Sequence, residues 1–194
     1  MARWITAAVE GEVDAAVVER LADHSGVSVS EIYGKNGKAA LKQRLSNYNN
    51  AAQFAPWLVL VDLDNDFSCA PDLVVSWLPN PARQMRFRVA VRQVEAWLLA
   101  DRERIAGFLG VRKSQVPSSP EDLTDAKRAL IDLARRSRRR DIRVDMVPRP
   151  SSGRKVGPAY VSRIIEYVYE AWRPRVAASN AASLAKCLRR LRAI

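Results

Sequence analysis

Histidine, cysteine and long apolar runs are scarce in this chain of 194 residues. His24 is the single histidine, at a predicted helix end, and Cys69 and Cys187 lack metal-ligand spacing. Zinc sites and His-dependent hydrolases are therefore poor candidates. Few cysteines favour a reducing, cytoplasmic setting. No apolar run approaches the roughly 20 residues of a membrane span, and no signal peptide is recognisable, so a membrane partner is not expected.

Positive charge is concentrated in the second part of the chain, although the net charge of the whole is +11. Residues 1–111 carry 12 Lys/Arg and 13 Asp/Glu, whereas residues 112–194 carry 20 and 8. Such a split is typical of an acidic chemical site joined to a surface that binds polyanions. A solvated basic surface without a ligand is the alternative.

Strand and helix patterns alternate through the first 111 residues. Apolar runs predict strands at 3–9, 27–33, 57–61 and 86–91, and helical periodicity predicts helices at 12–24, 38–54 and 95–101. The run 57–61 is wholly apolar, as in a strand covered on both faces. This alternation predicts an α/β fold with a parallel sheet of about four strands flanked by helices.

The pattern becomes helical after residue 111. Residues 117–120 resemble a linker, and helices are predicted at 121–137, 157–172 and 180–192, with a short strand at 142–147 as an exception. We therefore predict an α/β domain over residues 1–111 and a basic helical C-terminal extension over 112–194.

Acidic residues follow the ends of several predicted strands. Glu10 ends the first strand, Asp62 and Asp64 end the third, and Glu95 lies beyond the fourth. In an extended segment Asp62 and Asp64 would point the same way. Carboxylates this close repel each other unless a cation intervenes, and hard oxygen ligands suit Mg²⁺ or Mn²⁺. The alternative is that they cap helices and form turns.

Other phosphate and metal motifs fit less well. Asp62-x-Asp64-x-Asp66 begins like a calcium loop, but Phe67 replaces the turn glycine. Residues 34–38 lack the spacing of a P-loop. The strand followed by Asp-x-Asp also resembles haloacid-dehalogenase phosphatases, which leaves a phosphatase open.

Two segments resemble the Toprim family of bacterial primases and OLD-type nucleases. Residues 9–14 (Val-Glu-Gly-Glu-Val-Asp) resemble its first motif, and residues 59–64 (Val-Leu-Val-Asp-Leu-Asp) resemble its Asp-x-Asp motif. The resemblance implies a Toprim-like catalytic domain that binds magnesium through these acids. Asp14 stands where OLD-type nucleases usually have Glu.

The remainder resembles a bacterial Toprim-related family of unknown function that is often associated with defence ATPases. The segments concerned are 94–101, 157–160, 172–174 and 182–188. The resemblance implies nucleic acid, DNA or RNA, as the substrate and an ATPase as a further partner. It would give Glu10 and Asp14 one metal ion, with Glu10 alternatively a general base. Asp62, Asp64 and Asp66 would hold the other.

Glu95 is a further candidate ligand, or a helix-start residue favoured by the helix dipole. A cation beside the scissile phosphate is also expected. Lys35 and Lys38 precede a helix whose N–H groups favour anions, and Lys155 lies in a Gly/Ser segment that would close over substrate. Nucleic-acid backbone contacts are expected from the basic run: Arg135, Arg136, Arg138, Arg139, Arg140 and Arg143.

The sequence therefore favours a Mg²⁺-dependent nuclease, and the resemblance implies a role as a phage-defence effector. One alternative is an inactive Toprim-like adaptor whose basic extension binds nucleic acid or an ATPase. A phosphatase or nucleotidyl transferase is the third.

Overall fold

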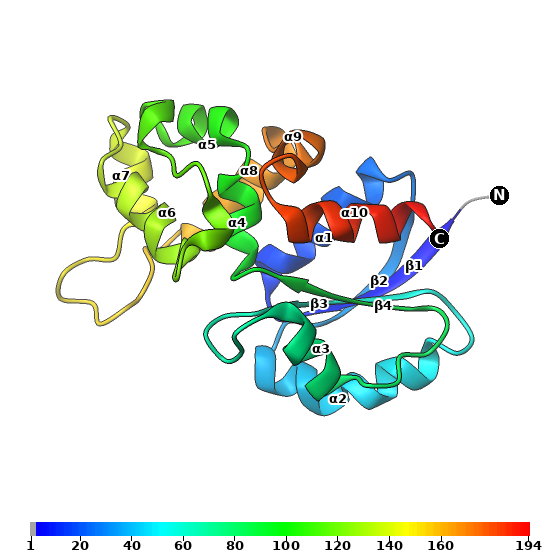
Figure 1. The fold of residues 1–194 in the computed structure, drawn as a ribbon. Helices are drawn as coiled ribbons and strands as arrows, with labels where there is room; N and C mark the ends of the chain where they lie inside the picture. The colour runs from blue at the N-terminus through cyan, green and yellow to red at the C-terminus, as the bar shows by residue number, and fades with distance from the viewer. Residues whose placement is uncertain (1–2) are drawn as a thin grey trace.

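The computed structural model describes residues 3–194, which form a parallel sheet, helices on both of its faces, and a helical group beyond one edge (Figure 1). The elements of the α/β part are β1 (Trp4–Val9), α1 (Glu12–His24), β2 (Ser28–Gly34), α2 (Lys38–Ala51), β3 (Trp57–Asp62), α3 (Ala70–Trp77) and β4 (Met85–Ala90). The later helices are α4 (Val94–Leu99), α5 (Arg102–Leu109), α6 (Ala126–Arg135), α7 (Arg140–Met146), α8 (Tyr160–Glu170), α9 (Pro174–Ala178) and α10 (Ala182–Arg192), with short 3₁₀ turns at Lys113–Gln115 and Pro120–Asp122.

The sheet has the order β2-β1-β3-β4, and every neighbouring pair is parallel. This confirms the predicted α/β fold with four strands. Residues 57–61 of β3 are all buried, as expected for a central strand covered on both faces. Because all four strands run the same way, their carboxyl ends meet at one edge of the sheet.

Two separate cores hold the layers together. On one face, α2 and α3 cover side chains such as Val59, Val61 and Phe87. On the other face, α1 and α10 lie against the sheet, and the core continues outward into the later helices. At roughly 25 cal/mol per Å² of buried apolar surface, these cores are the main source of stability.

The helices α4 to α8 gather at the carboxyl edge of the sheet, whereas α10 lies over one of its faces (Figure 1). Their core is continuous with that of the sheet, since one buried cluster contains Ile5 and Leu60 together with Tyr167 and Leu191. Trp97 in α4 donates from Nε1 to Ser183 Oγ over 2.7 Å, which ties α4 to α10. The boundary at residues 111 and 112 stays a prediction.

A buried ion pair fastens α5 to the segment before α9. Asp101 is fully buried and caps α5 by accepting the Arg104 N–H. Its two oxygens also accept three bonds from Arg173, at 2.7 to 3.1 Å. A buried carboxylate is tolerated when its lone pairs are satisfied in this way.

Two expectations about local structure were wrong. Residues 142–147 are not a strand, because Ile142 and Met146 are buried on one side of the helix α7. Residues 70–77 form a helix, α3, between the predicted strands at 57–61 and 86–91, where no helix was predicted. Pro71 lies in its first turn, where a missing N–H costs nothing. No helix of residues 3–194 is long and apolar enough to cross a membrane.

Candidate functional site: a carboxylate cavity at the sheet edge

Glu10 and Asp62 meet where β1 and β3 end. The backbone N–H of Asp62 donates to Glu10 Oε1 over 2.8 Å. Glu10 follows directly on β1, and Asp62 is the last residue of β3, so the sheet register holds their backbones. The two acids therefore lie at the same edge of the sheet, as the metal-site hypothesis requires.

Asp62 is held from a second side by the next helix. Its Oδ1 accepts the backbone N–H of Val94, the first residue of α4, over 2.8 Å. An acid beside the first N–H groups of a helix is stabilised electrostatically. One carboxylate oxygen of Glu10 and one of Asp62 thus accept a backbone N–H. The second oxygen of each makes no hydrogen bond within residues 3–194.

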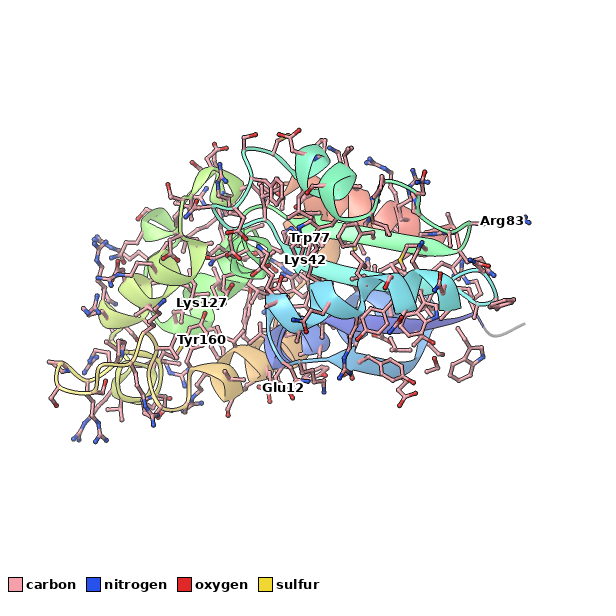
Figure 2. All side chains as sticks on the ribbon, turned by 90° about the horizontal axis from the view of Figure 1, so that it is seen from below. Glu12, Lys42, Trp77, Arg83, Lys127 and Tyr160 are labelled. Atoms are coloured by element: carbon pink, nitrogen blue, oxygen red, sulfur yellow. The ribbon has the colours of Figure 1, made fainter. Side chains whose placement is uncertain are left out.

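Glu95 is the most buried acid of the group, with 2% of its surface exposed. Tyr160, the first residue of α8, donates its hydroxyl to Glu95 Oε1 over 3.1 Å. Lys127 in α6 brings its Nζ to 3.3 Å from the same oxygen. Figure 2 shows Lys127 and Tyr160 close to each other at the junction of the helical group and the sheet. One carboxylate is therefore shared by two later helices.

Most of these side chains line one cavity of about 190 Å³, and Glu10 lies next to it, before Gly11. Asp14, in the first turn of α1, lines it together with Asp62 and Glu95. Lys127 and Tyr160 line it beside Glu95, and the remaining wall residues are Gly11, Glu12, Val13, Val94, Val156 and Val161. The cavity is large enough for an ion with part of its water, or for a phosphate group.

The acids raise one another's pKa values. Burial, followed by the charges of Glu95 and Glu10, raises the pKa of Asp14 to about 7. Burial and the charge of Asp14 raise the pKa of Asp62 well above its ordinary value. Burial raises that of Glu10 despite the Asp62 N–H. The cavity thus concentrates more negative charge than its own cations balance, which favours an added cation.

Lys127 is the cation that the sequence patterns missed. Burial alone would lower the pKa of its ammonium group, but Glu95, Asp62 and Asp14 raise it. Burial, and then the charge of Glu95, also raises the pKa of the Tyr160 hydroxyl. Lys127 follows Asp125, the N-cap of α6, and nothing in its neighbourhood along the chain marks it out. Only the packing of α6 on α4 brings it to the cavity.

Asp64 and Asp66 face a different cation. Lys38 Nζ lies 2.9 Å from Asp64 Oδ2 and 2.8 Å from Asp66 Oδ2. The expectation that Asp64 would extend the strand was wrong: its φ is 51°, a left-handed conformation that Asp tolerates better than most residues. Gln93 Nε2 donates to Asp64 Oδ1 over 3.2 Å, which holds the turned residue in place.

The acidic side chains are not arranged as a ready metal site. Within residues 3–194, no three His, Cys, Asp or Glu side chains are placed closely enough to hold an ion. The donor chemistry nevertheless suits a hard cation, because Asp14, Asp62 and Glu95 supply carboxylate oxygens at one cavity, and Glu10 adds another carboxylate beside Asp62. The carboxylates would have to rearrange to bring their oxygens to bonding distance of an ion.

The other predicted cations lie apart from the cavity wall. Lys35 pairs with Glu12 at 3.1 Å, beside the cavity mouth. Lys155 is exposed in the connection between α7 and α8, next to Val156, which does line the cavity. Its neighbours Arg149 and Arg154 line a second pocket that also includes Val156.

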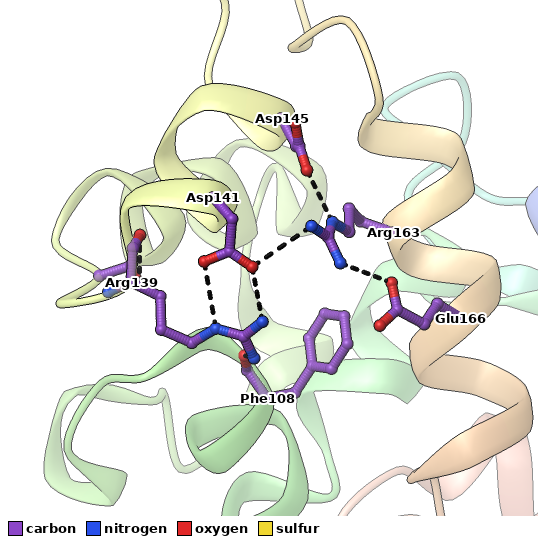
Figure 3. Close-up of polar contacts among 7 residues, drawn as sticks. Phe108, Arg139, Asp141, Asp145, Arg163 and Glu166 are labelled. Carbon is purple, nitrogen blue, oxygen red and sulfur yellow. Dashed lines mark hydrogen bonds and ion pairs between the residues drawn. The ribbon is translucent and has the colours of Figure 1, made fainter.

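The predicted basic run covers the end of α6 and the start of α7. Part of it is structural, as Figure 3 shows. Arg139 pairs with Asp141 at 2.6 Å and donates to the Phe108 carbonyl oxygen, and Arg143 donates to Ser137 O. Arg163 ties Asp141, Asp145 and Glu166 together. Arg136, Arg138 and Arg140 are exposed and form no ion pair within residues 3–194.

No protein-family model matches the chain, and no curated protein or solved structure matches it either.

Proposed function

We propose that the chain is a metal-dependent enzyme that hydrolyses phosphodiester bonds of nucleic acid. The observation that carries the proposal is the convergence of three carboxylates, Asp14, Asp62 and Glu95, on one cavity at the carboxyl edge of a parallel sheet, with Glu10 beside them on the backbone N–H of Asp62. Ligand and reaction sites of open α/β sheets usually lie at this edge. The resemblance of residues 9–14 and 59–64 to Toprim motifs supports the same reaction.

The four acids would hold Mg²⁺ or Mn²⁺, each through the oxygen that backbone and side-chain donors leave available. A bound ion of this kind neutralises phosphate charge and lowers the pKa of a coordinated water. The chain itself supplies the geometry. The Asp62 and Val94 N–H groups hold one oxygen each of Glu10 and Asp62, and the Tyr160 hydroxyl holds one of Glu95, so the remaining oxygen of each would turn toward the ion.

Lys127 would contact a non-bridging oxygen of the scissile phosphate. Its ammonium already lies at the cavity wall beside Glu95, where an added metal ion would weaken its attraction to Glu95 and free it for substrate. Lys155 remains the alternative cation, because its segment adjoins the cavity at Val156.

The exposed basic residues support a nucleic-acid substrate. Arg136, Arg138 and Arg140 lie at the α6–α7 junction, and Arg149 and Arg154 line the pocket that meets the cavity at Val156. Contacts of this kind bind the phosphate backbone with little sequence preference. They would position a strand across the cavity.

An adaptor without catalysis is the second candidate, and one observation favours it. Lys38 and Lys127 already pair with Asp64, Asp66 and Glu95, so part of the acidic charge is balanced by the chain itself. Such internal pairs are what remains when acids serve structure alone.

A cleavage assay with chelated and metal-loaded protein separates the two. Supercoiled plasmid, linear duplex, single-stranded DNA and RNA would be incubated with EDTA, Mg²⁺, Mn²⁺ or Ca²⁺. The proposal expects cleavage with Mg²⁺ or Mn²⁺ that EDTA stops and Asp62→Asn abolishes. If every substrate survives both ions while nucleic acid still binds, the enzyme proposal is wrong and the adaptor stands.

A further inference from the structure

The strand β4 is an outermost strand of the sheet, so it forms a lateral edge, distinct from the edge where the carboxyl ends meet. It lies at the bottom of a slot between two helices. Within residues 3–194 no strand pairs with its outer side. Figure 1 shows α3 on one side of this edge and α10 on the other. An unpaired edge strand presents N–H and C=O groups that readily accept another extended chain.

The outward-facing groups can be identified from the register. Trp57 N–H donates to Gln84 O, and Leu63 N–H donates to Ala90 O. The backbone N–H and C=O groups of the even-numbered residues of β4 therefore point toward β3. In a parallel ladder the intervening residues, Phe87 and Val89, then direct their N–H and C=O groups outward. The neighbouring outward groups are already used: Arg88 Nε donates to Phe87 O, and Val91 N donates to Ser183 Oγ.

The slot has apolar walls. A pocket of about 400 Å³ runs along the edge, and its lining includes Val74, Val75, Phe87 and Val89. Val75 in α3 is 66% exposed, the second largest exposed fraction among the large apolar side chains. A pocket of this volume has room for a few apolar side chains of an extended segment, such as one added strand.

One end of the slot is basic and lacks a counter-charge. Arg88 and Lys186 line both the apolar pocket and an adjoining one that adds Arg189 and Arg190. None of these four is in an ion pair within residues 3–194. The one acid of the slot, Glu121, is occupied in accepting the N–H groups of Ala182 and Ser183 at the start of α10.

Arg88 is the most telling of the four. Its guanidinium is half-buried against α10, and its only partner within the described chain is a backbone carbonyl oxygen. Burial, followed by the charges of Arg190 and Arg86, lowers its pKa. A desolvated cation surrounded by other cations is costly unless an anion is added.

We propose that this slot binds an extended, acidic segment of a partner protein as an added strand on β4. Apolar side chains of the segment would occupy the groove of Val74, Val75 and Phe87, and its carboxylates would pair with Arg88 and Lys186. The main chain would bond to Phe87 N and to Val89 N and O. This binding is independent of the carboxylate cavity, which lies at the carboxyl ends of β1 and β3.

The test uses a fluorescein-labelled, N-acetylated octapeptide of alternating Val and Glu, titrated with the whole protein in an anisotropy assay. Three matched peptides serve as controls: one with central prolines, one with Lys in place of Glu, and a scrambled one with all Glu residues together. We expect only the alternating acidic peptide to bind, and to protect the amides of Phe87 and Val89 from hydrogen exchange.

Lys186→Glu should weaken binding of the alternating peptide by about tenfold or more, since it replaces an attraction to the peptide's carboxylates with a repulsion. Arg44→Glu, an exposed position on α2, makes the same change of charge and should leave binding unaltered. Val75→Glu should also weaken it without affecting folding.

Equal binding of the proline or lysine peptide would overturn the proposal, as would wild-type affinity in Lys186→Glu. Two other results would also overturn it. If a single-stranded oligonucleotide displaced the peptide and itself protected the amides of Phe87 and Val89 from exchange, the slot would be a nucleic-acid site. Concentration-dependent dimerisation that Val75→Glu abolishes would mean that a second copy fills it.

Discussion

The backbone N–H of Asp62 donates to Glu10 Oε1 over 2.8 Å. The end of β3 therefore holds the side chain of the acid that directly follows β1. In Glu10→Gln the side-chain amide oxygen can accept the same N–H, and in Asp62→Asn this backbone donor is unchanged. A neutral isostere at either position therefore keeps the local geometry while it removes an anionic ligand.

Asp62→Asn and Glu10→Gln should each reduce metal-dependent cleavage by about 100-fold or more, the scale seen when a group that stabilises transition-state charge is removed. The melting temperature of the metal-free protein should be equal or higher, because repulsion with Asp14 and Glu95 is relieved. Asp66→Asn is the matched control: it faces Lys38 and not the cavity, so it should retain activity. Equal loss in all three, with lower melting temperatures, would show that the acids are structural.

Lys127→Gln should lower the cleavage rate at saturating substrate more than it lowers affinity for nucleic acid, because its ammonium faces the cavity. Lys155→Gln should do the reverse, since its exposed segment only adjoins the cavity. Single-turnover cleavage beside equilibrium binding distinguishes the two. The opposite result would assign the catalytic cation to Lys155.

Replacing Arg136, Arg138 and Arg140 together with Ala should flatten the salt dependence of nucleic-acid binding, by about 1 unit of slope per lost phosphate contact. These residues are exposed and free of ion pairs within the described chain, so the fold should persist. Arg139→Ala is a poorer probe, since it also breaks the pair with Asp141 (Figure 3). An unchanged slope would remove this surface from the nucleic-acid interface.

The two cysteines should differ sharply in reactivity. Cys69 is exposed, whereas burial raises the pKa of the Cys187 thiol to about 12. At pH 8 almost no Cys187 is thiolate, so a thiol reagent should modify one cysteine in the folded protein and two in denaturant. Peptide mapping after alkylation identifies the site. Rapid modification of Cys187 would mean that α10 detaches from the core readily.

Asp101→Ala should destabilise the fold by about 2 kcal/mol, the upper end for a lost N-cap, because the change also removes the buried carboxylate that accepts three bonds from Arg173. Asp122→Ala, an acid in the Pro120–Asp122 turn, is the control and should change stability little. Urea denaturation of both variants measures the difference. A loss equal to that of the control would show that the ion pair merely balances its own desolvation.

The sheet could be predicted from the sequence because apolar runs and turn residues are local signals. The strand at 57–61, for example, was recognisable from its unbroken apolar composition. The helix α3 was missed because Pro71 and the polar residues before it are typical of a loop, and only its packing over β4 makes it a helix. The segment 142–147 was misassigned because its alternating pattern is short enough to fit either period.

The site divides in the same way. Glu10 and Asp62 were identified because they follow strands, and the sheet necessarily brings neighbouring strand ends together. Asp64 could not be placed, since a single residue with positive φ breaks the alternation on which the prediction depended. Lys127 was missed because its approach to Glu95 depends on tertiary packing between helices distant in sequence.

The continuous core that joins Ile5 to Leu191 has a consequence for synthesis on the ribosome. While the nascent chain is incomplete, the face of the sheet that α10 covers stays open to water, and Trp97 lacks Ser183. Translation through the last helix is therefore needed to seal that face. A pause before residue 182 would leave an apolar surface for chaperones to bind, and a premature stop there should direct the chain to proteolysis.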